Sequence, residues 1–426
     1  MTARSALRRY TLVCFLTWLP VGLMMPTMVL LMTERGLGLA QIGLVLTVFS
    51  TVTVALELPT GGLSDVVGRR VMLAVSAGFL VAALALVSVS TTFWMFLAGG
   101  VLKGVARALS SGPAASWYVD TLHRAEGRDA DLKPGLSRGA AMESVSLCLG
   151  VLAGGALPLV VPPELFFPLA APSLAGAAAA AVLLVVVLLA LPEPPHARRS
   201  LGGVLREVPG TVVAGVRLAA GGRVLRRLML AAACSGVLLV SIELLTPGRM
   251  AQLTGTAEQG GTAYAVVAAL GFAGSAAGSA LAPRAARLAG GSPGGAIAGL
   301  VVAAFSVGAL AATAGLGGTA GLLTAGTAYV TLFAGLSVTG LLCLEMTHNA
   351  ITAAERTTVT STSSLSLQAG GIVANLTLGT LAAHAGTAAA WGLTAVVVLS
   401  SALLFVRMPV TGSSRAQDPA VRAGSG

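Results

Sequence analysis

The chain has 426 residues, of which 55% are hydrophobic and only 10% are charged, and its mean hydropathy is +0.88. A soluble protein would carry about a quarter of its residues as Asp, Glu, Lys or Arg. The apolar residues also come in long blocks, since residues 10–32 and 71–102 contain no charged residue. Each block exceeds the roughly 20 apolar residues that cross a bilayer as a helix. These features exclude a soluble globular protein and indicate an all-α, polytopic membrane protein.

The charged and metal-ligating residues indicate neither a nucleic-acid binder nor an enzyme. The net charge is +10, but the basic residues lie in short loops and form no continuous basic face. The four cysteines fall singly in apolar segments, which predicts neither disulfides nor a metal site. There is no HExxH motif, no GxxxxGK[ST] loop, and no histidine at a predicted helix centre. We therefore expect no enzyme, no ATP-driven pump, no cofactor and no nucleic-acid partner.

The apolar blocks predict twelve helices of spanning length. The first is longer than the core of a cleavable signal peptide, so we expect it to be retained. The predicted spans are 10–32, 40–62, 71–90, 92–119, 137–160, 165–192, 226–248, 262–283, 293–314, 319–346, 358–383 and 387–407.

The distribution of basic residues predicts the orientation. If the N-terminus is cytoplasmic, Arg35 and Arg249 are the only basic residues in outward loops. Lys103 and Arg107 fall inside a predicted helix, and all other basic residues lie in inward loops or at the termini. Cytoplasmic loops of membrane proteins carry such an excess. We therefore expect a monomer in the inner (plasma) membrane, with both termini cytoplasmic.

The six-plus-six layout predicts two pseudo-symmetric bundles. Apolar spacing over Leu201–Val208 fits either a short amphipathic helix on the membrane surface or a plain linker. The predicted organisation is an N-terminal six-helix bundle (1–192), a cytoplasmic linker (193–225), a C-terminal six-helix bundle (226–407) and a disordered tail (408–426).

A compact charged turn, Gly61-Gly62-Leu63-Ser64-Asp65-Val66-Val67-Gly68-Arg69-Arg70, joins the second and third predicted helices. Glycine permits the close helix approach and sharp turn that so short a loop requires. With Leu73 and the twelve-helix layout, this turn resembles the signature loop of the major facilitator superfamily. The segments beginning at Glu57 and at Arg356 resemble those of its drug and metabolite exporters.

The resemblance implies that this turn is a conformational gate made of Gly61, Asp65, Gly68, Arg69, Arg70 and Asp120. Asp65 would meet the start of the eleventh helix near residues 357–360, where a carboxylate is stabilised by the helix dipole. An arginine of the turn would pair with Asp120. The alternative is that the arginines only set the topology.

Charged residues inside the membrane are functional candidates, because placing one there is costly. Glu243, alone in the apolar seventh helix, is interpreted as a proton-coupling or cation-binding carboxylate. The alternatives are a residue that reaches the outer interface and one that forms a buried hydrogen bond to a Ser or Thr. Lys103 and Arg107 lie one turn apart on one face of the fourth helix. Each is a candidate for proton relay, for binding an anionic substrate group, or for pairing with Glu57 or Glu143. For Glu57 and Glu143 themselves, a structural network and a proton relay remain open.

Aromatic residues make up only 4% of the chain, and a few of them, with two methionines, are candidates for a cavity wall that accepts a flat, apolar compound. Trp18, Met24 and Met25 are expected to line a substrate cavity, as are Trp117 and Tyr118. Trp94 and Trp391, near predicted outer ends, are expected to be interface anchors.

Together these features predict a secondary active transporter that works by alternating access. The resemblance implies export of a small, partly hydrophobic drug or metabolite by proton antiport. The alternative is proton-coupled uptake of a small polar solute. The expected partners are the small-molecule substrate, protons and the lipid bilayer.

Overall fold

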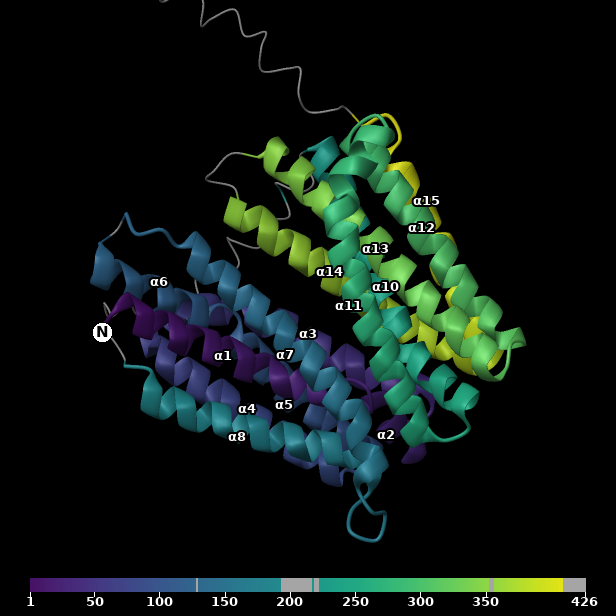
Figure 1. Cartoon of the computed structure of the whole chain (residues 1–426), viewed down its shortest axis with the longest axis horizontal. Helices are drawn as coiled ribbons and strands as arrows, with labels where there is room; N and C mark the ends of the chain where they lie inside the picture. The colour runs from purple at the N-terminus through teal and green to yellow at the C-terminus, as the bar shows by residue number, and fades with distance from the viewer. Residues whose placement is uncertain (128, 193–216, 218–221, 352–355, 409–426) are drawn as a thin grey trace, which may run out of the picture.

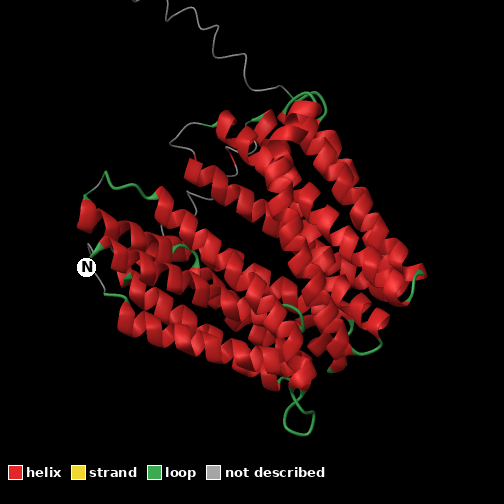
Figure 2. Ribbon diagram, viewed as in Figure 1, coloured by secondary structure: helices red, strands yellow, loops and turns green. Residues whose placement is uncertain are grey.

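The computed structural model describes residues 1–127, 129–192, 217, 222–351 and 356–408; the side chains of 58–63, 65–66 and 356–358 are also outside the description. Within these residues the chain forms helices joined by short loops and no strand (Figure 2). The predicted all-α fold is confirmed. The predicted linker helix and the tail beyond Met408 lie outside the described residues.

The helices form two bundles, labelled in Figure 1. The N-terminal half contains α1 (Ala3–Met24), α2 (Met28–Glu34), α3 (Leu39–Val67), α4 (Arg69–Val89), α5 (Phe93–Ser110), α6 (Pro113–Glu126), α7 (Lys133–Val160), η1 (Pro168–Ala170) and α8 (Ala171–Ala190). The C-terminal half contains α10 (Arg223–Thr254), α11 (Ala257–Leu288), α12 (Ser292–Ala312), η2 (Thr313–Gly315), α13 (Gly318–Ala350), α14 (Arg356–Ala385), α15 (Thr387–Ser401) and η4 (Ala402–Phe405).

Two predicted spans are interrupted. The span 10–32 is broken at Met25–Thr27 into α1 and α2, because Pro26 cannot donate a helical hydrogen bond. The span 92–119 ends early as α5, and α6 follows after Gly112, whose φ of 95° favours glycine. Eleven helical stretches of the described chain are long and apolar enough to cross a membrane, and α5, which carries Lys103 and Arg107, supplies the twelfth crossing.

The two halves repeat the same pattern of helix packing. In the N-terminal half α1 packs on α7, α3 on α5, and α4 on α8. In the C-terminal half the corresponding pairs are α10 with α14, α11 with α13, and α12 with α15. Six helices in each half thus pair in the same order. This repetition is the structural basis of the pseudo-symmetry that the sequence predicted.

Close helix packing within each half relies on glycine. A Cβ atom on Gly154 of α7 would lie 2.0 Å from the carbonyl oxygen of Leu23 on α1, and one on Gly150 would lie 2.9 Å from Gly22 Cα. Small residues are favoured at such interfaces in membranes, where helix association depends on close van der Waals contact. The large apolar side chains that remain exposed, such as Leu189 and Phe305, then face the surrounding lipid.

The two halves meet along α3 with α14 and along α7 with α11. We call the end where α1 begins and α8 ends the near end, and the opposite end, which holds α2, the far end. The interface includes Gly43 against the backbone of Asn375, and a hydrogen bond of 2.6 Å from Thr262 Oγ1 to the Gly155 carbonyl, both toward the far end. In Figure 1 the two halves come together around α2 and diverge toward the near end.

Candidate substrate cavity between the two halves

A cavity of about 420 Å³ lies between the halves at mid-depth. Its volume falls within the range of small-molecule sites, roughly 300–1,000 Å³. Helices of both bundles line it, so a compound inside contacts both halves. The side chains that give it its character are Trp18, Met24, Met25, Met28, Phe49, Lys103, Arg107, Glu243, Tyr264, Phe272, Tyr329 and Phe333. The expected residues Trp18, Met24 and Met25 are thus among its lining.

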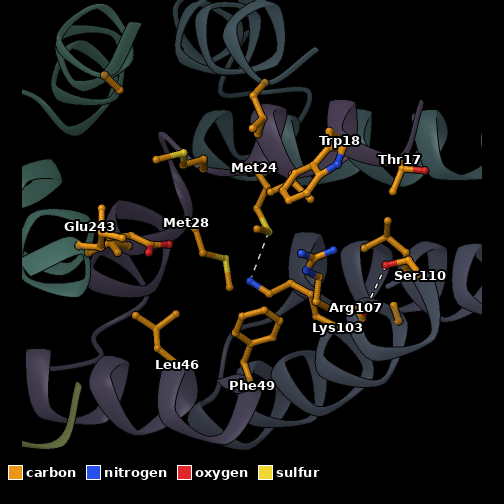
Figure 3. A pocket seen from close by; sticks show the side chains of 18 of the residues that line it. Thr17, Trp18, Met24, Met28, Leu46, Phe49, Lys103, Arg107, Ser110 and Glu243 are labelled. Atoms are coloured by element: carbon orange, nitrogen blue, oxygen red, sulfur yellow. Dashed lines mark hydrogen bonds between the residues drawn. The ribbon is translucent and has the colours of Figure 1, made fainter. Parts of the chain in front are cut away.

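Lys103 reaches into the cavity from α5 on the N-terminal side (Figure 3). Its Nζ lies 3.9 Å from Met24 Sδ and 4.4 Å from the centre of the Phe49 ring. A thioether is a weak hydrogen-bond acceptor, and an aromatic face attracts a cation without neutralising it. Among the described residues no carboxylate forms an ion pair with Lys103. Its ammonium group is therefore held in place but lacks a counter-ion in direct contact.

Glu243 enters the cavity from α10, on the opposite wall (Figure 3). Its side chain is open to the cavity, although the surrounding helices enclose it deep in the molecule. Within the described part of the chain it makes neither a hydrogen bond nor an ion pair, and the cation whose charge acts on it is Lys103. The mid-depth position argues against the alternative of an interfacial residue.

Arg107 is bound differently from Lys103, although it lies one turn away. Its guanidinium group stacks over the Trp18 ring, 4.7 Å from the ring centre. The carboxylates whose charges act on it are Glu57 and Glu143. The cavity therefore contains one cation, Arg107, that is balanced within its own half, and one, Lys103, whose balancing charge is Glu243 of the other half.

Glu57 connects the two halves. Its Oε1 accepts a hydrogen bond of 3.1 Å from Ser111, in the break between α5 and α6, and its Oε2 accepts one of 3.2 Å from Gln368 Nε2 on α14. Gln368 and Glu57 are 311 residues apart in the chain. Neither Glu57 nor Glu143 is part of the cavity lining.

The C-terminal wall of the cavity is aromatic, and the sequence analysis missed it. Tyr264 and Tyr329 meet edge to face at 6.3 Å, and Tyr329 and Phe333 lie 5.8 Å apart between ring centres. Tyr329 Oη donates a hydrogen bond of 2.9 Å to Thr246 Oγ1, which fixes the ring. The spacing of Tyr329 and Phe333 by one helical turn was the available signal.

Three tryptophan and tyrosine expectations need correction. Trp117 and Tyr118 are buried within the N-terminal bundle on α6 and are not part of the cavity lining; Trp117 Nε1 donates to the Pro192 carbonyl at 3.1 Å. They lie beyond the break at Gly112, which takes α6 off the line of α5. Trp391 is fully buried, because its face of α15 packs inside the C-terminal bundle. Trp94 is 72% exposed, as an interface anchor requires.

Comparison with known proteins agrees with this architecture. A family model described as Major Facilitator Superfamily matches residues 10–343. The chain belongs to the major facilitator superfamily. No curated protein matches its sequence. The resemblance of the sequence to this superfamily is thus confirmed.

Solved structures of superfamily transporters share the fold at low sequence identity. The nucleoside transporter NupG has a TM-score of 0.76 at 12% identity, covering 94% of this chain and 99% of that chain. A D-xylose-proton symporter has a TM-score of 0.72 at 13% identity, covering 96% and 99%. A bacterial homologue of the human lysosomal transporter Spinster, described as inward-facing and unoccupied, has a TM-score of 0.71 at 15% identity, covering 95% of each. These similarities establish the fold alone.

The superfamily's signature loop lies at the near end. Gly68 ends α3 and begins α4 with a φ of 102°. Arg69 forms an ion pair with Asp120 and donates to the Ser116 carbonyl, which ties α4 to α6, while Arg70 donates to the Leu188 carbonyl at the end of α8. The expected pairing with Asp120 is therefore present. Gly61 lies within α3, but its surroundings, the side chain of Asp65 and the side chains at the start of α14 are outside the description.

Metal binding is not supported by the described residues, which contain no group of three or more His, Cys, Asp or Glu side chains that could hold a metal ion. The four cysteines are free thiols on different helices. What the cavity offers is a pair of opposite charges on opposite walls, surrounded by thioethers and aromatic rings. This arrangement can bind and orient an organic molecule, and the carboxylate can hold a proton.

Proposed function

We propose that this protein is a proton-coupled transporter of a small, partly hydrophobic organic compound, and that it exports this compound by proton antiport. The observation that carries the proposal is Glu243, a carboxylate without a direct partner in the described chain, open to a largely apolar cavity between the two halves. A carboxylate enclosed in this way at mid-depth of a membrane protein binds either a proton or a cationic group, because leaving it charged and unpaired is costly.

Antiport follows if the proton and the substrate compete for Glu243. With the carboxylate protonated, the empty cavity would be able to switch from opening on one side of the membrane to opening on the other. The substrate would displace the proton when it binds. The methionine and aromatic walls favour a flat, apolar body over a sugar, which needs many hydrogen-bonding side chains. We also propose that the near end faces the cytoplasm, because Arg35 and Arg249 lie at the far end, and that the transporter acts as a monomer without enzymatic activity.

Uptake by proton symport is the second candidate. It is supported by the names of two similar structures, a D-xylose-proton symporter and a group of proton dependent oligopeptide transporters. In symport the proton and the substrate bind together, so a lower external pH would increase accumulation of the compound in the cell. Export instead lowers accumulation.

The proposal is tested by a toxicity and accumulation panel in a host that lacks its own efflux pumps. Expression of the protein should lower accumulation of at least one partly hydrophobic compound, and a protonophore should abolish this effect. Glu243→Gln should behave as the protonophore does, since the amide carries no proton to exchange. Glu345→Gln is the matched control, because Glu345 accepts a hydrogen bond from Ser292 at the near end, outside the cavity.

The outcomes separate the candidates. If expression raises the accumulation of the compound in the cell and a protonophore abolishes this rise, the function is uptake and the export proposal is wrong. Full activity of Glu243→Gln against a pH gradient in proteoliposomes would remove Glu243 from the coupling mechanism, provided that Glu345→Gln is equally active.

A further inference from the structure

We propose that the transported compound is a zwitterion, whose acidic group binds Lys103 and whose basic group binds Glu243, with a flat apolar body between them. This inference rests on the proposed function, because it names the class of compound that the cavity carries. It goes beyond that function because it assigns two opposite charges to the substrate, which the proposed function leaves open.

The first argument is that the two charges oppose each other across the cavity. Lys103 belongs to α5 and Glu243 to α10, and each is the charge that acts on the other. They are nevertheless further apart than the ~4 Å of an ion pair. Both groups point into the same cavity (Figure 3). A guest molecule placed between them can therefore reach both.

The second argument is that neither group has another counter-ion within the described residues. The contacts of Lys103 Nζ are Met24 Sδ and the Phe49 ring, neither of which carries a negative charge. Tyr264 and Tyr329 lie close enough for the charge of Glu243 to act on their hydroxyl groups, but a neutral phenol is no counter-ion. The Tyr329 hydroxyl is already donated to Thr246, so it does not serve Glu243.

The third argument distinguishes Lys103 from the neighbouring cation. Arg107 stacks on Trp18, and two carboxylates of its own half, Glu57 and Glu143, act on it. Since the charge of Arg107 is balanced without a guest, it forms part of the wall. For Lys103 the carboxylate that acts on it, Glu243, belongs to the other half and lies across the cavity. The site therefore offers one positive and one negative contact.

Charge balance then selects the class of guest. A simple cation at Glu243 would bring a second positive charge near Lys103, and a simple anion at Lys103 would bring a second negative charge near Glu243. Charges enclosed in a protein are tolerated when they are paired. A zwitterion pairs both groups at once and leaves the net charge of the cavity unchanged. The aromatic rings and methionines that line the cavity with these charges fit a flat apolar body.

The test measures binding of three matched probes to the purified protein in detergent by isothermal titration calorimetry. The probes are 4-(aminomethyl)benzoate, which has both charges, 4-methylbenzoate, which has only the acid, and 4-methylbenzylamine, which has only the base. We expect the zwitterion to bind roughly tenfold or more tightly than either singly charged probe, the equivalent of one charge-assisted hydrogen bond.

Variants assign each end of the probe. Lys103→Met should lower the affinity for the zwitterion and the acid but not for the amine, and Glu243→Gln should lower the affinity for the zwitterion and the amine but not for the acid. Lys103→Arg, which keeps the charge, should retain acid binding. Lys133→Met is the matched control, because Lys133, the other lysine of the chain, is exposed at the near end.

Several results would overturn the inference. If 4-methylbenzoate binds as tightly as the zwitterion, the site is one for anions, and if 4-methylbenzylamine does so, it is one for cations. If no probe binds at millimolar concentration, a site for this class is absent. The comparison of probes on the wild-type protein needs no variant to fold. Because no pH gradient is involved, these results are independent of whether proton antiport is confirmed.

Discussion

At the scale of single residues, the structure separates charges that hold the protein together from charges that face its cavity. Arg69 and Asp120 pair at the near end, where their side chains are 18% and 44% exposed. Arg70 and Arg9 donate to carbonyl groups at the end of α8, where a helix carries partial negative charge. Lys103 and Glu243, in contrast, reach into the cavity without such partners. We attribute their position to the compound that we propose the cavity binds.

The Arg69–Asp120 pair gives a prediction for the gate. Asp120→Asn should lower the stability of the purified protein by only about 0.2–1 kcal/mol, because water screens a partly exposed pair. It should lower transport turnover more than the apparent substrate affinity, because Asp120 lies outside the cavity. Asp65→Asn should have the same kinetic signature.

Measurement of kcat and KM for transport in proteoliposomes checks this prediction. Glu126→Gln, an exposed position on the same helix, is the control. A change in affinity alone would leave the loop with a topological role and no role in gating.

At the scale of helices, the sequence predicted the elements better than their breaks. Charge-free runs such as 71–102 identify spans because length and apolarity suffice for a helix in lipid. The division of the span 92–119 was missed, although the Gly112-Pro113 dipeptide is a turn signal. The cavity wall on α11 and α13 was also missed, because the face that a helix turns inward depends on its neighbours. The hydrogen bond from Gln368 to Glu57 joins residues too distant in sequence for any local pattern.

Helix packing gives a second prediction. Gly154→Ala should lower thermal stability by about 1–3 kcal/mol, the usual cost of overpacking, because the new Cβ would lie 2.0 Å from a backbone oxygen of α1. Thermal unfolding of the purified protein in detergent measures the effect. Gly340→Ala on α13 is the control, since a Cβ there has no atom within 4 Å. Equal stability of the two variants would contradict the close contact of α1 and α7.

At the scale of the whole molecule, the described conformation is held together toward the far end. There α3 meets α14 and α7 meets α11 through Gly43, Thr262 and their partners. The two bundles diverge toward the near end (Figure 1). Transport by alternating access requires this far-end contact to open. Glycine at position 43 permits the contact, and a larger residue should weaken it.

The third prediction tests this contact. A Cβ on Gly43 would lie 2.1 Å from the Asn375 carbonyl oxygen, so Gly43→Ala should disfavour far-end closure. A cost of about 1–3 kcal/mol corresponds to a shift of roughly 5- to 150-fold in the equilibrium between the two states. Val29→Cys, placed in the cavity lining of a variant without native cysteines, should then react faster with a membrane-impermeant thiol reagent added outside cells.

Gly78→Ala on α4 is the control for this experiment, because a Cβ there meets nothing within 4 Å. It should leave the reaction rate of Val29→Cys unchanged. If Val29→Cys reacts as slowly in the Gly43→Ala protein as in the protein with glycine at position 43, closure at the far end does not depend on the approach of α3 to α14.

The interruption at Met25–Thr27 has a mechanical consequence. The peptide after it, α2, touches α10 and α11 of one bundle as well as α3 of the other, whereas α1 is packed within a single bundle. When the bundles rotate, α1 and α2 must change their mutual angle or α2 must leave one set of neighbours. Pro26 removes the backbone hydrogen bond that would resist such bending. The first membrane crossing is therefore two separate helices joined by a flexible break. A substitution that makes this break rigid should slow the transport cycle for any substrate.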